Sequence, residues 1–162
     1  MNYLGLDKDR IEKVSKELNT LLSCYHVYYQ NLRKFHWHVE GHNFFDMHQL
    51  FEDMYNDARV KIDEIAERVL TLRFRPIGDL SAYLEHSKVH EAQTGLSDEE
   101  MIEKILHDHT QIIKCMRTVL EFAGDAHDEG TIDLVAGYLG DIEKRSWMLD
   151  AWRKKKFTTA VA

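Results

Sequence analysis

Apolar residues recur every three or four positions over residues 7–38, which is the spacing of one face of an α-helix. The stripe consists of Ile11, Val14, Leu18, Leu21, Leu22, Tyr25, Tyr28, Leu32 and Phe35. We predict one long amphipathic helix that stops near Gly41, because glycine ends a helix at low backbone cost. His36 continues the inward-facing stripe, where an imidazole needs a hydrogen-bond partner or a metal ion.

A turn over residues 39–45 precedes a second helical pattern, which we expect to begin near Asp46 as N-cap and to end near Leu72. Its apolar positions are Met47, Phe51, Met54, Ala58, Ile62, Ile65 and Val69. A second, polar stripe is rotated from the apolar one by roughly 100–120°. It consists of His48, Glu52, Arg59, Asp63 and Glu67. These side chains border the core face, a position that suits a site completed by a neighbouring element.

The connection over residues 73–97 is the longest in the chain and contains a short helical candidate at residues 80–86. A link of this length can join two helices that run in the same direction. Together with two further helical patterns, which follow over residues 98–123 and 131–154, this predicts an all-α protein. We expect a ferritin-like four-helix bundle whose long crossover between helices two and three carries a short extra helix. Residues 1–162 are expected to form a single domain.

A capping box marks the start of the predicted third helix, with Ser97 at the N-cap and Glu100 three residues later. We expect this helix to run to about Ala123 and to end at Gly124-Asp125. After a short acidic turn, a fourth helix is expected over residues 131–154.

Composition supports long helices, since the 162 residues include one proline and only eight glycines. The formal charge of −7 argues against a general nucleic-acid binder and suits attraction of cations. No stretch approaches the ~18–20 apolar residues of a membrane span, and we expect a cytoplasmic protein. Cys24 and Cys115 are too few for a disulfide framework and are interpreted as two free thiols.

Two pairs of potential metal ligands, His48 with Glu52 and Asp63 with Glu67, are each spaced to share one helix face. Imidazoles and carboxylates together are the ligands of a dinuclear iron site. The two pairs lie about 22 Å apart along one helix, whereas metal–ligand bonds are about 2 Å long. A two-fold axis between two antiparallel copies would bring them together, with His36 joining the first pair. A monomer would then be inactive.

The specific motifs of this window are His36-Trp37, Gly41, Asn43-Phe44-Phe45, His48, Glu52, Asp63 and Ala66-Glu67-Arg68. In this combination the chain closely resembles the Dps family of mini-ferritins over about residues 10–152. The resemblance implies a hollow dodecameric shell that oxidises Fe(II) with hydrogen peroxide, or with O2, at inter-subunit dinuclear sites. It implies ferric mineral storage in the cavity, which would protect DNA and the cell from oxidative damage. The implied iron ligands are His36, His48, Glu52, Asp63 and Glu67.

Further roles follow from the same resemblance. Trp37 matches the family tryptophan beside the site and is a candidate for taking up oxidising equivalents. Glu52 and Asp53 are expected to face the cavity and nucleate mineral.

The acidic segment between the predicted third and fourth helices has two interpretations. It resembles the family's acidic three-fold pores, which admit cations, and this implies iron entry past Asp125, Asp128 and Asp133. Alternatively, acidic residues at a helix start are stabilised by the helix dipole and need no other function.

DNA binding is a further activity of the family, often through a Lys-rich N-terminal tail, which this chain lacks. Its basic run is Arg153, Lys154, Lys155 and Lys156, within a C-terminal tail over residues 153–162 that we expect to be mobile. Many copies could bind DNA weakly by avidity, or the run is a cationic helix end favoured by the dipole. A chiefly structural, DNA-compacting shell is therefore an alternative function.

A third functional class is a bundle hydrolase with one zinc or nickel ion at His36, His38 and His48. It would hold its metal within a single chain and would be active as a monomer or dimer. We interpret His38 and His42 instead as turn or surface residues.

Two other groups of polar residues are interpreted as structural. His107 and His109 flank Asp108 on the third helix, where we expect a solvated face. Three tyrosines of the first helix are expected to serve in core and interface packing: Tyr25, Tyr28 and Tyr29.

Overall fold

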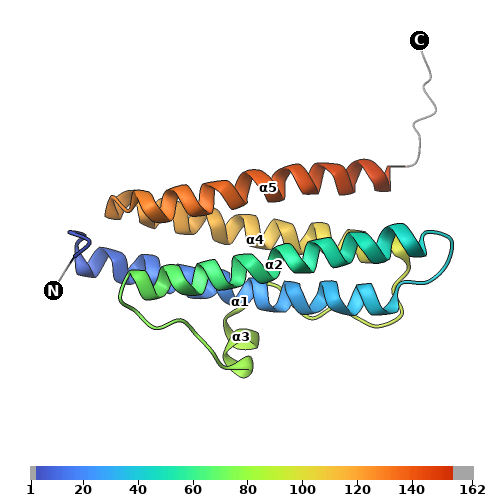
Figure 1. Cartoon of the computed structure of the whole chain (residues 1–162), viewed down its shortest axis with the longest axis horizontal. Helices are drawn as coiled ribbons and strands as arrows, with labels where there is room; N and C mark the ends of the chain where they lie inside the picture. Colours follow the sequence, from blue (N-terminus) through green and yellow to red (C-terminus); the bar gives the residue numbers. More distant parts are fainter. Residues whose placement is uncertain (1–2, 155–162) are drawn as a thin grey trace, which may run out of the picture.

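The structure is a computed structural model that describes residues 3–154. This part of the chain folds into five α-helices and contains no strand (Figure 1). The helices are α1 (Lys8–His38), α2 (Phe44–Thr71), α3 (Leu80–His86), α4 (Asp98–Ala126) and α5 (Glu129–Arg153). The long helices α1, α2, α4 and α5 form a bundle, in which α1 packs against α2 and α4, and α4 packs against α5. The expected four-helix bundle is confirmed.

The crossover returns along the length of the bundle, so α2 and α4 run in the same direction (Figure 1). On its way it forms α3, which packs on the outside of α1. His26 of α1 and Tyr83 of α3 stack with their ring centroids 3.8 Å apart. The predicted crossover with a short helix at residues 80–86 is therefore confirmed.

The core lies along the apolar stripes that the spacing predicts. Every predicted core position of α1 is buried, and so are those of α2 except Ile62, which is half-buried. Fully buried aromatic rings from both helices meet where Phe35 of α1 contacts Phe51 of α2, with centroids 5.7 Å apart. This packing fixes the rotation of α2, and therefore the direction in which its polar stripe faces.

The helix α2 begins at Phe44, two residues before the expected Asp46. Asn43 occupies the N-cap position but makes no side-chain cap hydrogen bond. Its amide donates instead to the Asp98 carboxylate at 3.0 Å, across to the start of α4. Asp46 lies in the first turn of α2, where the helix dipole favours its charge.

The helix α4 begins with both hydrogen bonds of the predicted capping box. The prediction that it ends at Gly124-Asp125 was wrong, because the helix continues to Ala126. A glycine within a helix costs only about 1 kcal/mol, and here the buried Ala123 and Ala126 continue the packing face around it. The helix stops at His127, which adopts the left-handed conformation with φ 52°.

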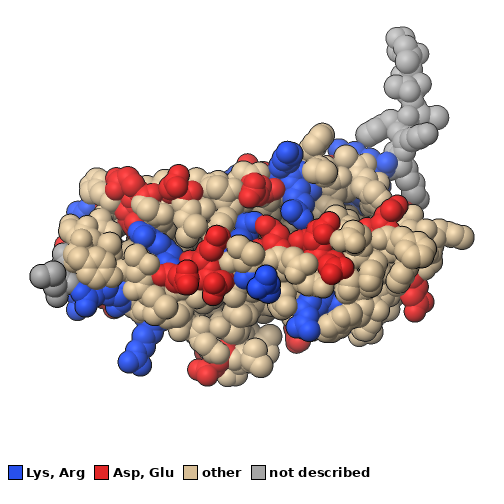
Figure 2. Space-filling view, in the orientation of Figure 1, with Lys and Arg blue, Asp and Glu red and all other residues tan. Residues whose placement is uncertain are grey.

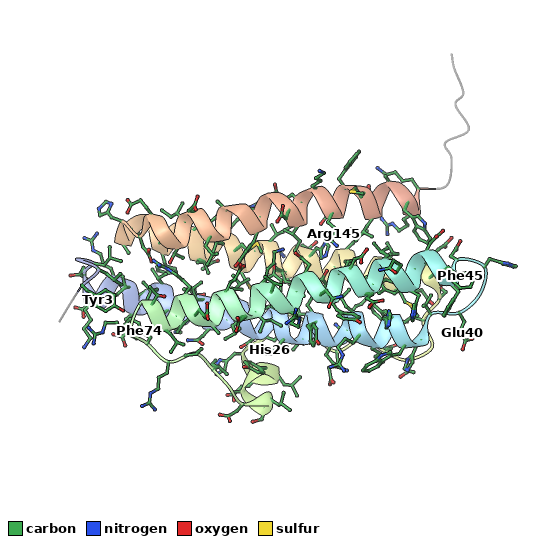
Figure 3. All side chains as sticks on the ribbon, in the orientation of Figure 1. Tyr3, His26, Glu40, Phe45, Phe74 and Arg145 are labelled. Atoms are coloured by element: carbon green, nitrogen blue, oxygen red, sulfur yellow. The ribbon has the colours of Figure 1, made fainter. Side chains whose placement is uncertain are left out.

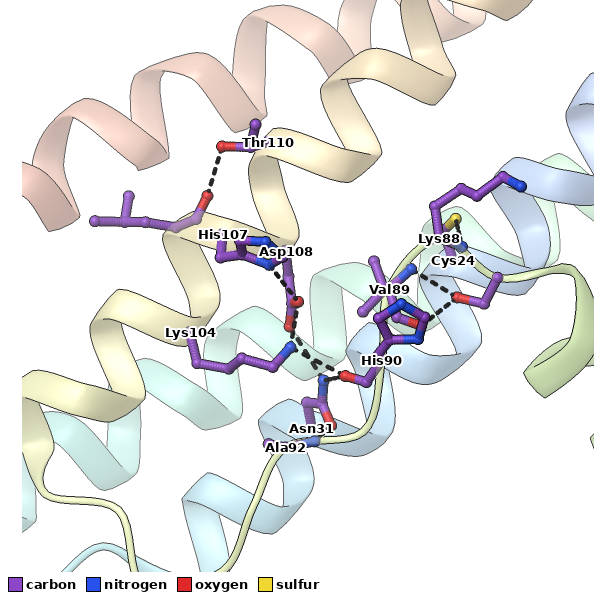
Figure 4. Close-up of polar contacts among 12 residues, drawn as sticks. Cys24, Asn31, Lys88, Val89, His90, Ala92, Lys104, His107, Asp108 and Thr110 are labelled. Atoms are coloured by element: carbon purple, nitrogen blue, oxygen red, sulfur yellow. Dashed lines mark hydrogen bonds and ion pairs between the residues drawn. The ribbon is translucent and has the colours of Figure 1, made fainter.

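The crossover is held to the bundle by buried polar side chains (Figure 4). The Asn31 amide donates to the backbone carbonyl of His90 at 3.0 Å and accepts from the backbone N–H of Ala92 at 2.8 Å. Asn31 also donates to the carboxylate of the fully buried Asp108 at 3.1 Å. Lys104 forms an ion pair with the same carboxylate. Burial raises the pKa of Asp108, and the Lys104 ammonium opposes that rise.

His109 is also buried, so the expected solvated face at Asp108 and His109 was wrong; only His107 of that group is exposed. Ser146 donates to a backbone carbonyl, so its hydroxyl accepts from Nδ1–H of His109 at 2.7 Å. The Nε2 atom of His109 then accepts from the Tyr28 hydroxyl at 2.7 Å. Burial lowers the pKa of His109 to about 3, so the neutral imidazole joins three helices.

The surface carries many charges of both signs. Clusters of acidic side chains alternate with basic ones on the face seen in Figure 2. Within the described residues, no helix is long and apolar enough to cross a membrane.

Candidate metal centre

The end of α1 and the start of α2 are brought together by the short turn between them. Because the two helices run antiparallel, His36 near the end of α1 meets His48 in the second turn of α2. Their rings stack with centroids 3.7 Å apart and planes 21° apart. Both imidazoles are half-buried, so they combine a fixed position with access from outside the chain.

The two histidines are joined by a reciprocal pair of hydrogen bonds. The Nδ1 atom of His36 lies 2.8 Å from the backbone carbonyl oxygen of His48, and Nδ1 of His48 lies 2.8 Å from that of His36. A carbonyl oxygen only accepts, so both Nδ1 atoms must carry the proton. In the neutral rings, both Nε2 atoms therefore have a free lone pair, which is the tautomer a metal ligand needs.

Neighbouring aromatic rings hold this histidine pair in position. Phe44 stacks on His48 at 4.9 Å, and Tyr55 meets His36 edge-on at 5.3 Å. Glu52 lies one helical turn after His48 and is half-buried. Partial desolvation and the charge of the neighbouring Glu52 carboxylate raise the pKa of Tyr55. The structure thus brings His36, His48 and Glu52 to one end of the bundle.

The other predicted ligands, Asp63 and Glu67, lie far along α2 and are exposed. His48 is near the bundle end marked by Phe45 and Glu40, whereas Glu67 is near the opposite end, where Phe74 follows α2 (Figure 3). At about 1.5 Å per residue, Asp63 lies about 22 Å from His48. A single chain therefore keeps the two ligand groups apart.

Asp63 and Glu67 are also not neutralised by their own chain. Among the described residues, their carboxylates have no hydrogen-bond or ion-pair partner. Arg68 follows Glu67 directly, but its guanidinium contacts Asp128 and Thr131 instead. Within the described residues, these two carboxylates are therefore not part of an intrachain ion-paired surface.

A complete metal site does not form within the described part of one chain, where no group of three or more His, Cys, Asp or Glu side chains could hold an ion. His38 and His42 are exposed. The single-chain zinc or nickel site at His36, His38 and His48 therefore finds no support in these residues.

Trp37 projects from the outer side of α1 and is 55% exposed. The Arg33 guanidinium lies over its ring, 4.7 Å from the centroid, and also 5.4 Å from the ring centroid of Tyr29. These cation–π contacts orient the indole. A redox role for Trp37 stays a prediction.

The acidic residues around the start of α5 separate into two kinds. The Asp128 side chain is 1% exposed and forms an ion pair with Arg68. It also caps α5 by accepting from the backbone N–H of Thr131 at 3.1 Å. Its carboxylate is thus engaged inside the chain, which argues against a pore role, whereas Asp125 and Asp133 are exposed.

The basic run at the end of α5 is only partly described. Arg153 lies 3.5 Å from the Glu103 carboxylate and 3.4 Å from that of Asp150, and Lys154 lies 2.8 Å from Asp150. These two cations are therefore already paired with acids. Lys155, Lys156 and the rest of the expected mobile tail lie outside the described residues.

Sequence reasoning missed the reciprocal bonding of the two histidines and the part of Tyr55. Tyr55 follows Glu52 by three positions and His48 by seven, so its place on the same helix face was readable from the spacing. The reciprocal hydrogen bonds could not be predicted from the spacing, because they depend on the geometry of the turn between the two helices.

Comparison with known proteins gives consistent matches over nearly the whole chain. Residues 15–156 match the model of the ferritin-like domain family. The DNA protection during starvation protein of Porphyromonas gingivalis is 41% identical over 96% of this chain and 98% of its own length. DNA protection during starvation protein 2 of Bacillus anthracis is 36% identical over 87% of this chain and 97% of its own length.

Solved structures agree. The Dps protein of Vibrio cholerae O1, described as a member of a broad superfamily of ferritin-like diiron-carboxylate proteins, superposes with a TM-score of 0.92. It is 38% identical and covers 95% of this chain and 97% of its own. Dps from Staphylococcus aureus superposes with a TM-score of 0.87 at 39% identity, covering 90% of this chain and 97% of its own. With its ferritin-like fold, its stacked pair His36 and His48 and these relatives, the chain belongs to the Dps family.

Proposed function

We propose that this protein oxidises Fe(II) with hydrogen peroxide at sites formed between two copies of the chain and stores the ferric product. One half-site is His36, His48 and Glu52, and the other is Asp63 and Glu67 of a second copy. The protein would act in iron storage and detoxification as a hollow dodecameric shell. O2 would be a slower alternative oxidant.

The observation that carries the proposal is the fixed tautomer of the histidine pair. Both Nδ1 protons are held by backbone carbonyl oxygens at 2.8 Å, which leaves both Nε2 lone pairs for a metal ion. Such a half-site needs negatively charged partners. Asp63 and Glu67, which have no partner among the described residues of their own chain, lie on the same helix at a distance that another copy could bridge. A two-fold axis would create two equivalent sites in each dimer.

The ligand types suit iron as the substrate. Imidazoles give the site affinity for Fe(II), while carboxylates favour the harder Fe(III) ion. Two Fe(II) ions each lose one electron to one peroxide molecule, whose O–O bond breaks, and with two protons two water molecules form. Pairing the two electrons at one site avoids release of hydroxyl radical. Trp37 would take up oxidising equivalents from incomplete turnovers.

Entry and storage would use other acidic residues. Asp125 and Asp133 are exposed near the start of α5, and repetition around a three-fold axis would concentrate their charge and attract Fe(II). Glu52 and the exposed Asp53 would nucleate mineral at the cavity wall. Asp53 accepts a hydrogen bond from Gln49 at 2.9 Å, which would orient its carboxylate.

DNA would be protected by removal of iron and peroxide more than by direct binding. The relatives that are named for DNA protection support this role for the chain. Compaction of DNA is the second candidate function, but Arg153 and Lys154, the described part of the basic run, are already paired with acids.

A subunit-complementation experiment tests the shared site. One variant carries His36→Ala and His48→Ala, and a second carries Asp63→Ala and Glu67→Ala. Each variant alone should lose iron oxidation, because every site lacks one ligand group. In a mixed dimer one site loses both groups, while the other has all of its ligands. Co-assembled variants should therefore regain activity, because about half of the sites in each mixed dimer are complete.

The readout is ferric absorbance after anaerobic Fe(II) addition followed by peroxide. Mixing the separately assembled, non-exchanging variants is the control and should restore nothing. If co-assembly also restores nothing although mixed particles form, or if either variant alone keeps wild-type activity, the shared-site proposal fails.

A further inference from the structure

Two cysteines that play no part in the iron site meet in the core. Cys24 of α1 and Cys115 of α4 are buried, and their Sγ atoms lie 3.7 Å apart. The residues are 91 positions apart in the sequence, so the fold alone brings the two thiols together. The distance is that of van der Waals contact, and a disulfide bond of about 2 Å would need side-chain rotation and a small approach of the helices.

The surroundings make the two thiols unequal. The backbone N–H of Lys88, in the crossover, points at Cys24 Sγ from 3.2 Å (Figure 4). Hydrogen bonds from the Cys115 thiol and from Lys88 lower the pKa of Cys24, against the opposing effect of burial. The neighbouring Cys24 sulfur and burial raise the pKa of Cys115. Because the Lys88 N–H donates to Cys24 Sγ, Cys24 is the sulfur of the pair that ionises more readily.

A short non-helical segment of the crossover separates this pair from solvent. The segment over Cys24 is residues 87–89, which are not helical. Two local hydrogen bonds of the Ser87 hydroxyl join Ser87 to Val89. Lys88 between them is exposed. Ser87 and Val89 are buried, so peroxide reaches Cys24 when this segment opens locally. Hydrogen peroxide is little larger than water, so a small opening is sufficient.

We propose that Cys24 and Cys115 are a peroxide-sensitive dithiol that forms an intrachain disulfide. The Cys24 thiolate attacks hydrogen peroxide, the O–O bond breaks, and Cys24 becomes a sulfenic acid while hydroxide leaves. Cys115 gives its proton to that hydroxide, and its sulfur displaces the hydroxyl group of the sulfenic acid as a second hydroxide, which a solvent proton converts to water. One peroxide is reduced by two electrons, and two thiols become one disulfide.

The bond would link α1 to α4 across most of the chain. Cross-linking residues so distant in sequence restricts the unfolded chain strongly, so the oxidised protein should resist unfolding better than the reduced one. Each chain would gain a second way to consume peroxide that needs no iron. The protein would thereby become more stable under the conditions in which its iron chemistry is needed.

The experiment uses assembled, metal-free, fully reduced protein treated with excess hydrogen peroxide. Remaining thiols are then alkylated in denaturant, and the chain is digested with trypsin without reduction. Cys24 falls in the peptide of residues 17–33 and Cys115 in that of residues 115–117. We expect these two peptides to become disulfide-linked, both thiols to be lost together, and dithiothreitol to restore them. The oxidised protein should show a higher urea midpoint than the reduced protein.

Two single variants test the assigned roles. In Cys115→Ser, Cys24 should be trapped by dimedone as a sulfenic acid, whereas in Cys24→Ser the Cys115 thiol should persist. Because iron is absent, the outcome is independent of the iron-oxidation proposal. Retention of both thiols in the wild-type protein overturns the inference, as do disulfides found only between chains. That wild-type measurement stands even if a variant fails to fold.

Discussion

His36 and His48 of the same chain form two reciprocal hydrogen bonds. The Nδ1 atom of each ring lies 2.8 Å from the backbone carbonyl oxygen of the other histidine. The folding role and the proposed ligand role of each histidine thus lie on different atoms of one ring. The Nδ1–H group ties α1 to α2, and Nε2 is the atom proposed to bind iron. The two roles can be separated by substitution.

Asparagine at position 48 can place an amide N–H where Nδ1–H donates, but it has no counterpart of Nε2. We therefore expect His48→Asn to keep a near-native urea midpoint. His48→Ala should lose about 0.5–1.5 kcal/mol of stability with the hydrogen bond. Both should reduce the rate of iron oxidation by more than about tenfold. A wild-type oxidation rate in His48→Asn would contradict the assignment of Nε2 as a ligand.

The buried His109 should make stability fall in acid. The pKa of His109 is lowered to about 3 in the folded protein from an ordinary value of 6.5. Between these two pH values the imidazole is protonated in the unfolded chain but neutral in the folded chain. The stabilisation is therefore complete above pH 6.5 and is lost as pH falls towards 3. Within that window His109 contributes a slope of about 1.4 kcal/mol per pH unit.

Urea unfolding at several pH values, compared between wild type and His109→Gln, measures that slope. The variant should be less stable at pH 7 but should lose less stability between pH 6 and pH 4. His107→Gln, at an exposed neighbouring position, is the control and should follow the wild type. Parallel pH profiles for wild type and His109→Gln would show that His109 is not the group responsible.

Helix positions and core stripes could be predicted because they depend on local spacing and on glycine and proline usage. The separation of the two groups of candidate ligands along α2 could be predicted for the same reason, since helix rise fixes it. The burial of Asp108 and His109 was not predicted, because ionisable residue types usually lie on the surface and their positions on the helix were given less weight. Both lie three or four residues from Ile105 and Ile112 on the core stripe, so the spacing pointed inward.

Features that depend on tertiary contacts could not be read from the chain. The pairing of Arg68 with Asp128 joins residues 60 positions apart, and no local pattern distinguishes Asp128 from its acidic neighbours. The end of α4 shifted for a related reason: packing of Ala126 outweighs the helix-breaking tendency of Gly124. The contact between Cys24 and Cys115 likewise exists only once α1 and α4 are packed.

Asp128 is expected to act in folding and not in iron entry. Its carboxylate is buried in the ion pair with Arg68 and caps α5, so Asp128→Ala leaves a guanidinium partly buried without its partner. We expect a loss of about 3–5 kcal/mol, measured by urea unfolding. If the variant is as stable as the wild type but takes up iron slowly, Asp128 is a pore residue after all.

Asp125 and Asp133 should show the opposite behaviour. Both are exposed, so Asp125→Asn and Asp133→Asn should change stability by no more than about 0.5 kcal/mol. If they line a three-fold entry, the double variant should slow the initial rate of Fe(II) uptake several-fold. The effect should shrink as salt is raised, because screening weakens attraction of the cation. Unchanged uptake at low salt would place iron entry elsewhere.

DNA binding is expected to be weak and to depend on the tail. Arg153 and Lys154 are engaged by Glu103 and Asp150, and the chain carries a net charge of −7, which repels the phosphate backbone. In a gel-shift series we expect any complex to dissociate before about 0.15 M salt. Removal of residues 153–162 should abolish what remains at low salt, while iron oxidation stays unchanged. Retention of DNA at physiological salt by the full chain, lost on truncation, would instead favour the compacting role.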